Sequence, residues 1–117
     1  MYTIYISHHK GSNTLDIIKN SRLNYTHNLI YNTTNDFSDM KNLIMESQFM
    51  VADISEQSID VGIAIGIALE QNIRVIFIKK EETNVSVEGV GGNNVITYKD
   101  GDELVDKLEK SIEFIGF

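Results

Sequence analysis

The side chains best suited to hold a small charged ligand lie between positions 53 and 69. An apolar stretch leads there into a short polar loop, and a run rich in Gly, Ala and Ile follows. Ser58 stands where a helix N-cap is needed, so its hydroxyl and the free amides after it could hold a phosphate oxygen. Asp53, Ser55 and Asp60 add polar groups beside it. We therefore expect a site for a phosphate-bearing ligand in this segment.

Two glycines follow in the same run. Inside a helix, Gly62 and Gly66 cost roughly 1 kcal/mol each relative to alanine, which is easier to explain if a strand, a ligand or a second subunit approaches the helix closely. We expect the ligand to approach Gly62, whereas packing of the helix on a sheet explains Gly66 equally well. Because apolar residues surround the segment 59–71, a second subunit could cover one of its sides. The sequence thus predicts a homo-oligomer, most simply a homodimer.

A second polar cluster, made of Ser7, His8, His9 and Lys10, follows an apolar stretch near the start of the chain. One of its histidines could donate a hydrogen bond to a ligand phosphate or base. Adjacent loop histidines rarely converge on one metal, and no other His/Asp/Glu group has ligand spacing. We therefore expect no metal and no cofactor. The G-x-S-x-G elbow, the P-loop and a complete G-x-G-x-x-G motif are all missing from the sequence.

Apolar strands alternate with amphipathic helices along the chain. The predicted strands cover residues 3–6, 25–31, 49–54, 73–78 and 95–98. The predicted helices cover residues 14–21, 36–47, 59–71 and 102–115. Residues 79–93 are polar and rich in glycine toward their end, which predicts a long loop.

This alternation is typical of a doubly wound α/β fold, of flavodoxin or Rossmann type, with helices on both faces of a five-stranded parallel sheet. The length of 117 residues fits one domain, 1–117. In such sheets ligands bind beyond the carboxyl ends of the strands, where the winding reverses. The loops 7–12, 32–36 and 55–60 are expected at that edge.

Composition excludes several classes of protein. A net charge of -7 disfavours binding to duplex nucleic acid, although helix N-termini can still bind a small anion. The chain has no cysteine, which excludes disulfides and thiolate metal sites. Its longest apolar run, 61–69, is far shorter than the ~20 residues of a membrane span, and its first residues show no secretory signal. We expect a cytoplasmic protein without membrane contact.

The segments 51–55, 58–69 and 73–78 together resemble the nucleoside 2-deoxyribosyltransferase family, in particular its small 2'-deoxynucleoside 5'-phosphate N-hydrolases. Residues 4–12 are similar to the first strand and nucleotide loop of that branch. The closing residues 95–104 fit its last strand and helix. The resemblance implies a nucleotide ligand bound at the sheet edge.

Residue by residue, the resemblance places the phosphate-contacting serine on Ser58 and puts Lys10 near a basic residue of the first loop. The glutamate nucleophile of the family, which attacks the anomeric carbon, falls on Ala64. Alanine cannot act as a nucleophile. Asp60 stands where the N-hydrolases tend to have a small residue, and it puts a negative charge beside the expected phosphate position.

Three functions remain open. The first is a non-catalytic protein that captures or senses a nucleotide or ADP-ribose-type signal, such as a phage or mobile-element sponge of a defence signal. The second is an active N-glycosidase or deoxyribosyltransferase that uses a displaced carboxylate such as Glu56, Asp53 or Asp60. The third is a structural subunit without a ligand, or a relative of Toll/interleukin-1 receptor domains, whose first strand residues 5–8 also resemble.

Overall fold

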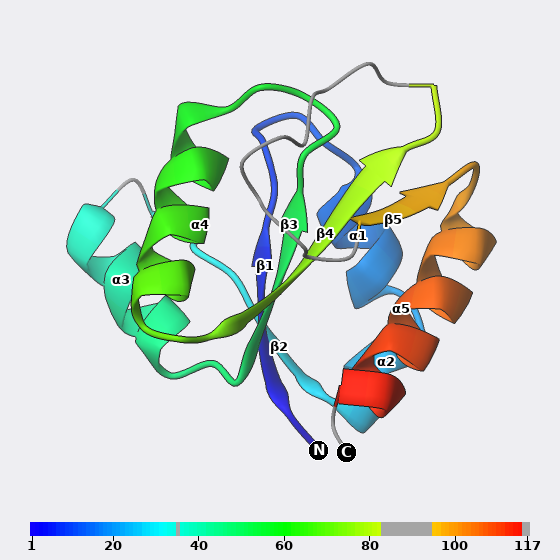
Figure 1. Ribbon diagram of the computed structural model, residues 1–117, viewed down its shortest axis with the longest axis horizontal. Coiled ribbons are helices and arrows are strands. Elements are labelled where there is room, and N and C mark those ends of the chain that lie inside the picture. Colours follow the sequence, from blue (N-terminus) through cyan, green and yellow to red (C-terminus); the bar gives the residue numbers. More distant parts are fainter. Residues whose placement is uncertain (35, 83–94, 116–117) are drawn as a thin grey trace.

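Five strands form one sheet in the computed structural model, which describes residues 1–34, 36–82 and 95–115 (Figure 1). The strands are β1 (Thr3–Ser7), β2 (Asn28–Ile30), β3 (Phe49–Asp53), β4 (Arg74–Lys80) and β5 (Val95–Tyr98). The helices are α1 (Thr14–Lys19), α2 (Leu23–Thr26), α3 (Phe37–Met45), α4 (Ile59–Glu70) and α5 (Gly101–Ile115). All neighbouring strands are parallel, in the order β2-β1-β3-β4-β5, so the predicted doubly wound parallel fold is confirmed.

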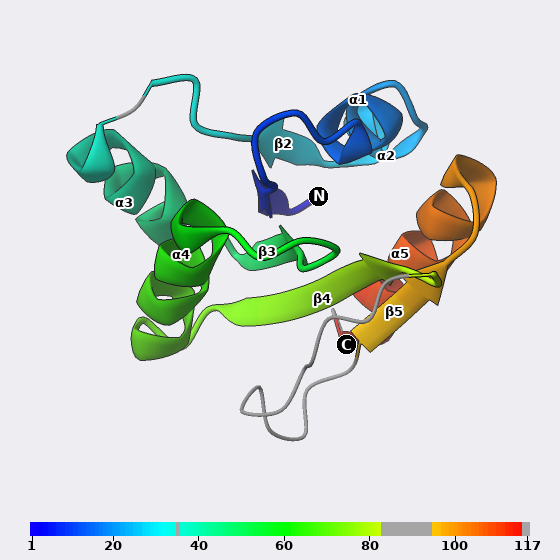
Figure 2. The same cartoon turned by 90° about the horizontal axis from the view of Figure 1, so that it is seen from above.

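The helices cover both faces of the sheet, with α3 and α4 on one side and α1, α2 and α5 on the other (Figure 2). Successive residues of a strand point to opposite faces. Ile4 and Ile6 of β1 therefore pack with α1 and α5, while Tyr5 between them packs with α3 and α4. Two cores result, one on each face, which explains the nearly continuous apolar sequence of the inner strands.

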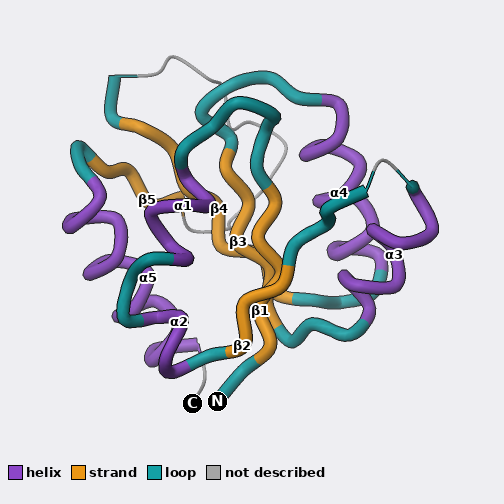
Figure 3. The backbone as a smooth tube through the Cα atoms, turned by 180° about the vertical axis from the view of Figure 1, so that it is seen from behind, coloured by secondary structure: helices purple, strands orange, loops and turns teal. Residues whose placement is uncertain are grey.

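The winding of the sheet reverses at β1. From β1 the chain passes through α1 and α2 to β2 on one side, and it then returns through α3 to β3 on the other side of β1. Seen from behind, the strands run between the two groups of helices (Figure 3). The connections that follow β1 and β3 therefore diverge, and space for a ligand opens at the carboxyl edge between them.

The predicted strand at 25–31 is wrong in its first half. Leu23–Thr26 forms one helical turn, α2, and β2 begins only at Asn28. The turn is fixed locally, because the amide of Leu23 donates to the Ser21 hydroxyl and the Leu23 side chain is fully buried. Tyr25 projects into solvent, 88% exposed, so its β propensity does not decide the backbone.

The two helices on the α4 side begin at side-chain caps. The Asp36 carboxylate accepts hydrogen bonds from the amides of Ser38 and Asp39, and the Ser58 hydroxyl accepts one from Val61. Both caps satisfy amides that have no partner inside the helix. The N-cap predicted at Ser58 is thus present. None of the described helices is long and apolar enough to cross a lipid bilayer.

The predicted loop at 79–93 is only partly described. Its first two residues, Lys79 and Lys80, instead continue β4. There β4 pairs with β5, with Lys80 opposite Tyr98. Residues 83–93, which include the glycines at 89, 91 and 92, lie outside the described residues.

Candidate functional site

A cavity of about 630 Å³ opens at the carboxyl edge of β1, where the winding reverses. This volume lies in the range of small-molecule sites, about 300–1,000 Å³. Four segments line it: the end of β1 with its loop, the loop after β2, the start of α3 and the start of α4. The lining residues are Tyr5, Ile6, Ser7, His8, Lys10, Asn32, Thr33, Thr34, Asp36, Phe37, Met40, Asp60 and Ile63.

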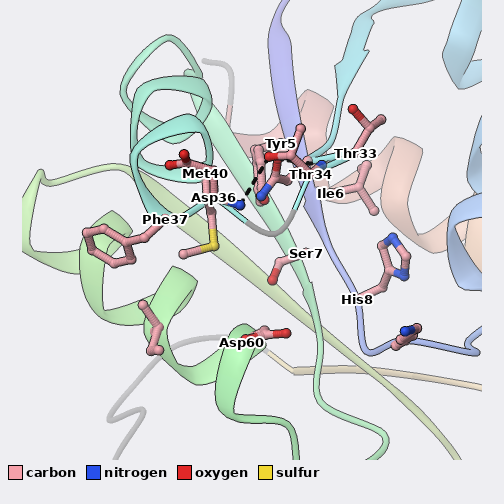
Figure 4. A pocket seen from close by; sticks show the side chains of 13 residues that line it. Tyr5, Ile6, Ser7, His8, Thr33, Thr34, Asp36, Phe37, Met40 and Asp60 are labelled. Carbon is pink, nitrogen blue, oxygen red and sulfur yellow. Dashed lines mark hydrogen bonds between the residues drawn. The ribbon is translucent and has the colours of Figure 1, made fainter.

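Four of the residues singled out in the sequence line this cavity, namely Ser7, His8, Lys10 and Asp60. Figure 4 shows Asp60 on α4 together with Phe37 and Met40 on α3, and His8 on the opposite side of the opening. The cavity therefore has cationic or hydrogen-bonding groups on the β1 side, an apolar wall from α3, and a carboxylate from α4. Such a surface suits a ligand with both an anionic end and a planar or apolar end.

Asp60 is the carboxylate most available to a ligand. It lies in the first turn of α4, it is exposed, and within the described residues no hydrogen bond or ion pair engages it. The other lining carboxylate, Asp36, is occupied as the cap of α3, with its oxygen 2.7 Å from the amide of Ser38. A sugar hydroxyl or another donor could therefore bind Asp60 without displacing an existing contact.

Tyr5, a residue of β1, lines the cavity. Burial raises the pKa of the Tyr5 hydroxyl to about 12, and the charge of Asp60 adds to this rise, while a hydrogen bond with the backbone of Asn32 acts in the opposite direction. The hydroxyl therefore stays protonated at neutral pH. It can donate to a ligand or orient one, but it cannot serve there as a base.

Asp53, by contrast, is turned away from the cavity and fully buried, with 1% of its surface exposed. Its carboxylate accepts hydrogen bonds from the hydroxyls of Ser12 and Thr14 and from the amide of Ser55. The Thr14 hydroxyl also lies 3.5 Å from that of Tyr98. Because both carboxylate oxygens are already bonded, Asp53 holds the loop after β1 against the end of β3 and does not reach the cavity.

Ser55 and Ser58 also have structural partners. The Ser55 hydroxyl accepts a hydrogen bond of 3.0 Å from the amide of Lys80 and so ties the loop after β3 to the end of β4. The Ser58 hydroxyl lies 3.3 Å from the Val61 amide as the cap of α4. Neither serine lines the cavity, although the loop 55–60 lies at the expected edge of the sheet.

The side chains of His9 and Glu56 meet across the two loops, with 3.3 Å between the His9 Nε2 and a carboxylate oxygen. Neither side chain lines the cavity. His9 Nδ1 is buried and has no hydrogen-bond partner among the described residues. Its backbone oxygen lies 3.2 Å from Nδ1 of His8. His8 is therefore the histidine that the fold presents to a ligand.

Gly62 and Ala64 do not line the cavity either. Ala64 is fully buried in the core under α3 and α4, together with Met40. It follows Asp60 by four residues, so the two lie on the same face of α4, one turn apart. The position that the resemblance assigns to the glutamate nucleophile is thus taken by Ala64, which packs in the core. The nearest carboxylate on this helix, that of Asp60, lies one turn earlier.

Several lining residues were not singled out in the sequence, above all Phe37, Met40 and Ile63. Phe37 and Met40 are apolar positions of the predicted helix 36–47, and their spacing marks them as core. Their place at the start of a helix that follows the predicted edge loop 32–36 could have marked them as residues near the site. Among the described residues, no group of three His, Asp or Glu side chains lies close enough to hold a metal ion.

Comparisons with known proteins support the fold. A CMP N-glycosidase, BcmB, from Clostridium botulinum is similar over 93% of this chain and 98% of its own, with a TM-score of 0.70 and 17% sequence identity. The N-terminal domain of the nisin resistance regulator NsrR, a lantibiotic response regulator, is similar over 94% and 96%, with a TM-score of 0.65 and 19% identity. No family model and no curated protein sequence matches the chain.

A third similar structure is the signal receiver domain of a LuxO repressor protein from Vibrio parahaemolyticus, with a TM-score of 0.59 and 15% identity over 95% of this chain. An N-glycosidase and two regulators therefore share this arrangement of strands and helices. Since one fold serves unrelated functions, the choice among them depends on the residues in the cavity.

Proposed function

We propose that the chain binds a nucleotide, or a signal derived from one, in the cavity at the end of β1 and leaves its N-glycosidic bond intact. One observation carries this proposal: Lys10, His8 and Asp60 all line the cavity that opens where the winding of the sheet reverses. Lys10 and His8 would bind the phosphate, Asp60 a ribose hydroxyl, and Phe37 and Met40 the base. The similar fold of a CMP N-glycosidase supports a ligand of this class.

The second half of the proposal rests on Ala64. Covalent cleavage of a glycosidic bond needs a nucleophile within reach of the anomeric carbon, and a buried alanine offers none. Of the displaced carboxylates, Glu56 is paired with His9 and Asp53 with three donors. Neither lines the cavity. Capture without turnover would suit a protein that senses or sequesters a signal.

Isothermal titration calorimetry with a panel of nucleoside monophosphates measures the affinity of the protein for each nucleotide. Lys10→Gln should weaken the binding of the preferred nucleotide by about 10- to 100-fold, since a hydrogen bond to a charged group contributes about 1.5–3 kcal/mol. Lys110→Gln removes an equal charge from an exposed position of α5 and is the matched control, which should change little. If no nucleotide binds, or if both variants behave alike, the proposed site is wrong.

One observation favours a second function, hydrolysis of the N-glycosidic bond. Asp60 is the displaced carboxylate that lines the cavity, and within the described residues nothing engages it. In this alternative Asp60 attacks the anomeric carbon, the C–N bond breaks, and the base leaves with a proton from water. A second water then hydrolyses the ester. The signature is release of free base that Asp60→Asn abolishes while binding persists.

A further inference from the structure

Lys10 stands at the tip of a turn formed by residues 9–12. The amide of Ser12 donates a hydrogen bond of 3.1 Å to the backbone oxygen of His9 and closes the turn. Gly11, the third residue of the turn, has a φ of +91°, which a residue with a Cβ atom rarely adopts. Lys10 is exposed, and within the described residues no hydrogen bond or ion pair holds its ammonium group. Its position at the cavity therefore depends on the turn.

Both ends of this turn are bonded to the end of β3 and the loop after it. His9 Nε2 lies 3.3 Å from a carboxylate oxygen of Glu56. The hydroxyl of Ser12 donates a hydrogen bond of 3.1 Å to the carboxylate of Asp53, the buried last residue of β3. The loops after β1 and β3 accordingly lie side by side at the top of Figure 1. We call residues 9–12, held in this way, the clamped turn.

The segment 53–60, which holds the clamped turn, also places the opposite wall of the cavity. It runs from the end of β3 to the first turn of α4, where Asp60 lines the cavity. The Ser55 hydroxyl bonds it to the amide of Lys80 in β4. The cation of Lys10 and the carboxylate of Asp60 are thus both fixed relative to one short stretch of backbone. A ligand that contacts both does not have to order a loose loop on binding.

We propose that Glu56 and Asp53 are positioning residues for Lys10. They act through His9 and Ser12 and do not contact the ligand themselves. This inference rests on the proposed function, in which Lys10 binds the phosphate. Without the clamp only a fraction of the chains present Lys10 to the cavity, and the apparent dissociation constant rises by the inverse of that fraction. Two acids of a strongly acidic chain would therefore strengthen the binding of an anion.

The sign of one effect separates this role from that of a nearby charge without a structural role. Glu56 is an acid close to a site for an anion, so by charge alone its removal should tighten binding. As a positioning residue, its removal should weaken binding. Because the Glu56 side chain is 69% exposed, its contact with His9 is a surface contact of modest strength. Glu56→Gln should therefore weaken binding by about 2- to 5-fold.

The second contact of the clamp is tested at Ser12. Removal of Asp53 would disturb a fully buried network, whereas Ser12→Ala leaves its carboxylate bonded to the Thr14 hydroxyl and the Ser55 amide. The fold should therefore persist. Ser12→Ala should weaken binding by about 3- to 10-fold, the size of one lost hydrogen bond. Ser12→Thr keeps the hydroxyl and should bind like the unmodified protein.

Isothermal titration calorimetry with the nucleoside monophosphate that binds best measures these variants alone and combined with Lys10→Gln. Because the clamp acts through Lys10, Glu56→Gln and Ser12→Ala should cause no further loss of affinity in the Lys10→Gln background. Glu70→Gln removes an equal charge from the exposed far end of α4 and should change little. Circular dichroism shows whether each variant is folded.

The outcomes separate this inference from the proposed function. If Lys10→Gln weakens binding but Glu56→Gln tightens it, Glu56 is not a positioning residue, although the site stands. The same holds if Glu56→Gln or Ser12→Ala weakens binding equally with and without Lys10. A loss in Ser12→Thr as large as in Ser12→Ala overturns the role of Asp53. If no nucleotide binds, the proposed function and this inference both fail.

Discussion

Helices α4 and α5 cover opposite faces of the same sheet, yet their outer sides have different chemistry. The exposed positions of α5 are mostly charged, for example Asp106, Lys107 and Lys110. Those of α4 are mostly Ile, Leu and Gly between Asp60 and Glu70. On the α5 side, Arg22 bonds to Asp106 and Glu109, so charges there find partners within the chain. The outer side of α5 is therefore mostly charged, whereas that of α4 exposes apolar side chains and glycines.

The inner sides of the two helices differ less. Leu104, Leu108 and Ile112 of α5 are fully buried, as are Ala64 and Ala68 of α4. The side chains that α5 turns to the sheet are large, whereas several of those that α4 turns to it are small. The first turn of α4 lies beside the end of β1, where Asp60 lines the cavity. The same helix therefore lines the cavity near its start and exposes apolar side chains along its outer side.

The largest effect should come from shortening a buried side chain of α5. Leu108→Ala should lower the free energy of unfolding by about 2–5 kcal/mol, because it leaves a cavity in a core where Leu108 is fully buried. Leu69→Ala on α4 should cost less than about 1 kcal/mol at low protein concentration, because Leu69 is exposed. Urea unfolding measures both. Equal losses would mean that the outer side of α4 is already packed within one chain.

A smaller effect, of opposite sign, is expected at Gly66. Gly66→Ala should raise the stability of the single chain by up to about 1 kcal/mol, since alanine is the better helix former and its Cβ meets open space. Thermal unfolding at low concentration measures the gain. A loss of stability there would show that Gly66 is needed for packing inside the chain.

The smallest effect concerns pH on the side of α5. Burial lowers the pKa of His27, and the amino group of Met1 lowers it further, while Glu109 acts in the opposite direction. The neutral ring accepts a hydrogen bond of 3.1 Å from the amide of Tyr2. His27 therefore binds a proton more readily in the unfolded chain, where its pKa has the ordinary value of 6.5, than in the folded one. This stabilisation is complete above that pH and is lost as the pH falls through the folded pKa.

Comparison with His27→Gln isolates that contribution, because glutamine does not titrate. Between about pH 7.5 and about pH 5 the unmodified protein should lose about 1 kcal/mol or less relative to the variant, the size of one hydrogen bond. Urea midpoints at the two pH values give the difference. A parallel decline of both proteins would assign the whole pH dependence to other groups.

Much of the fold could be predicted from the sequence, because strands buried on both faces give continuous apolar runs such as 49–54. The short helix α2 could not, since its turn depends on a hydrogen bond from the amide of Leu23 to Ser21 and on burial of Leu23. Four residues give no measurable period. A local hydrogen bond to a side chain therefore stabilises a helical turn where the residue propensities indicated a strand.

The edge of the sheet at which the cavity opens was predicted more accurately than the residues that line it. The loops 7–12 and 32–36 do lie at the edge where the cavity opens. Asp53 and Ser55 adjoin that edge in sequence, but their side chains bond to other loops, and such tertiary partners leave no trace in spacing. Phe37 and Met40 line the cavity from α3. Apolar periodicity could not tell a residue that lines a ligand site from one that packs in the core.

The central claim is that the cavity holds a nucleotide without cleaving it. The most direct measurement mixes the protein with an equal amount of the nucleoside monophosphate that binds best and quantifies intact nucleotide and free base by chromatography over time. Without a nucleophile at position 64 the nucleotide should be recovered intact, because alanine cannot attack the anomeric carbon. Release of one equivalent of free base, absent in Asp60→Asn, would contradict the account and make Asp60 the nucleophile of an enzyme.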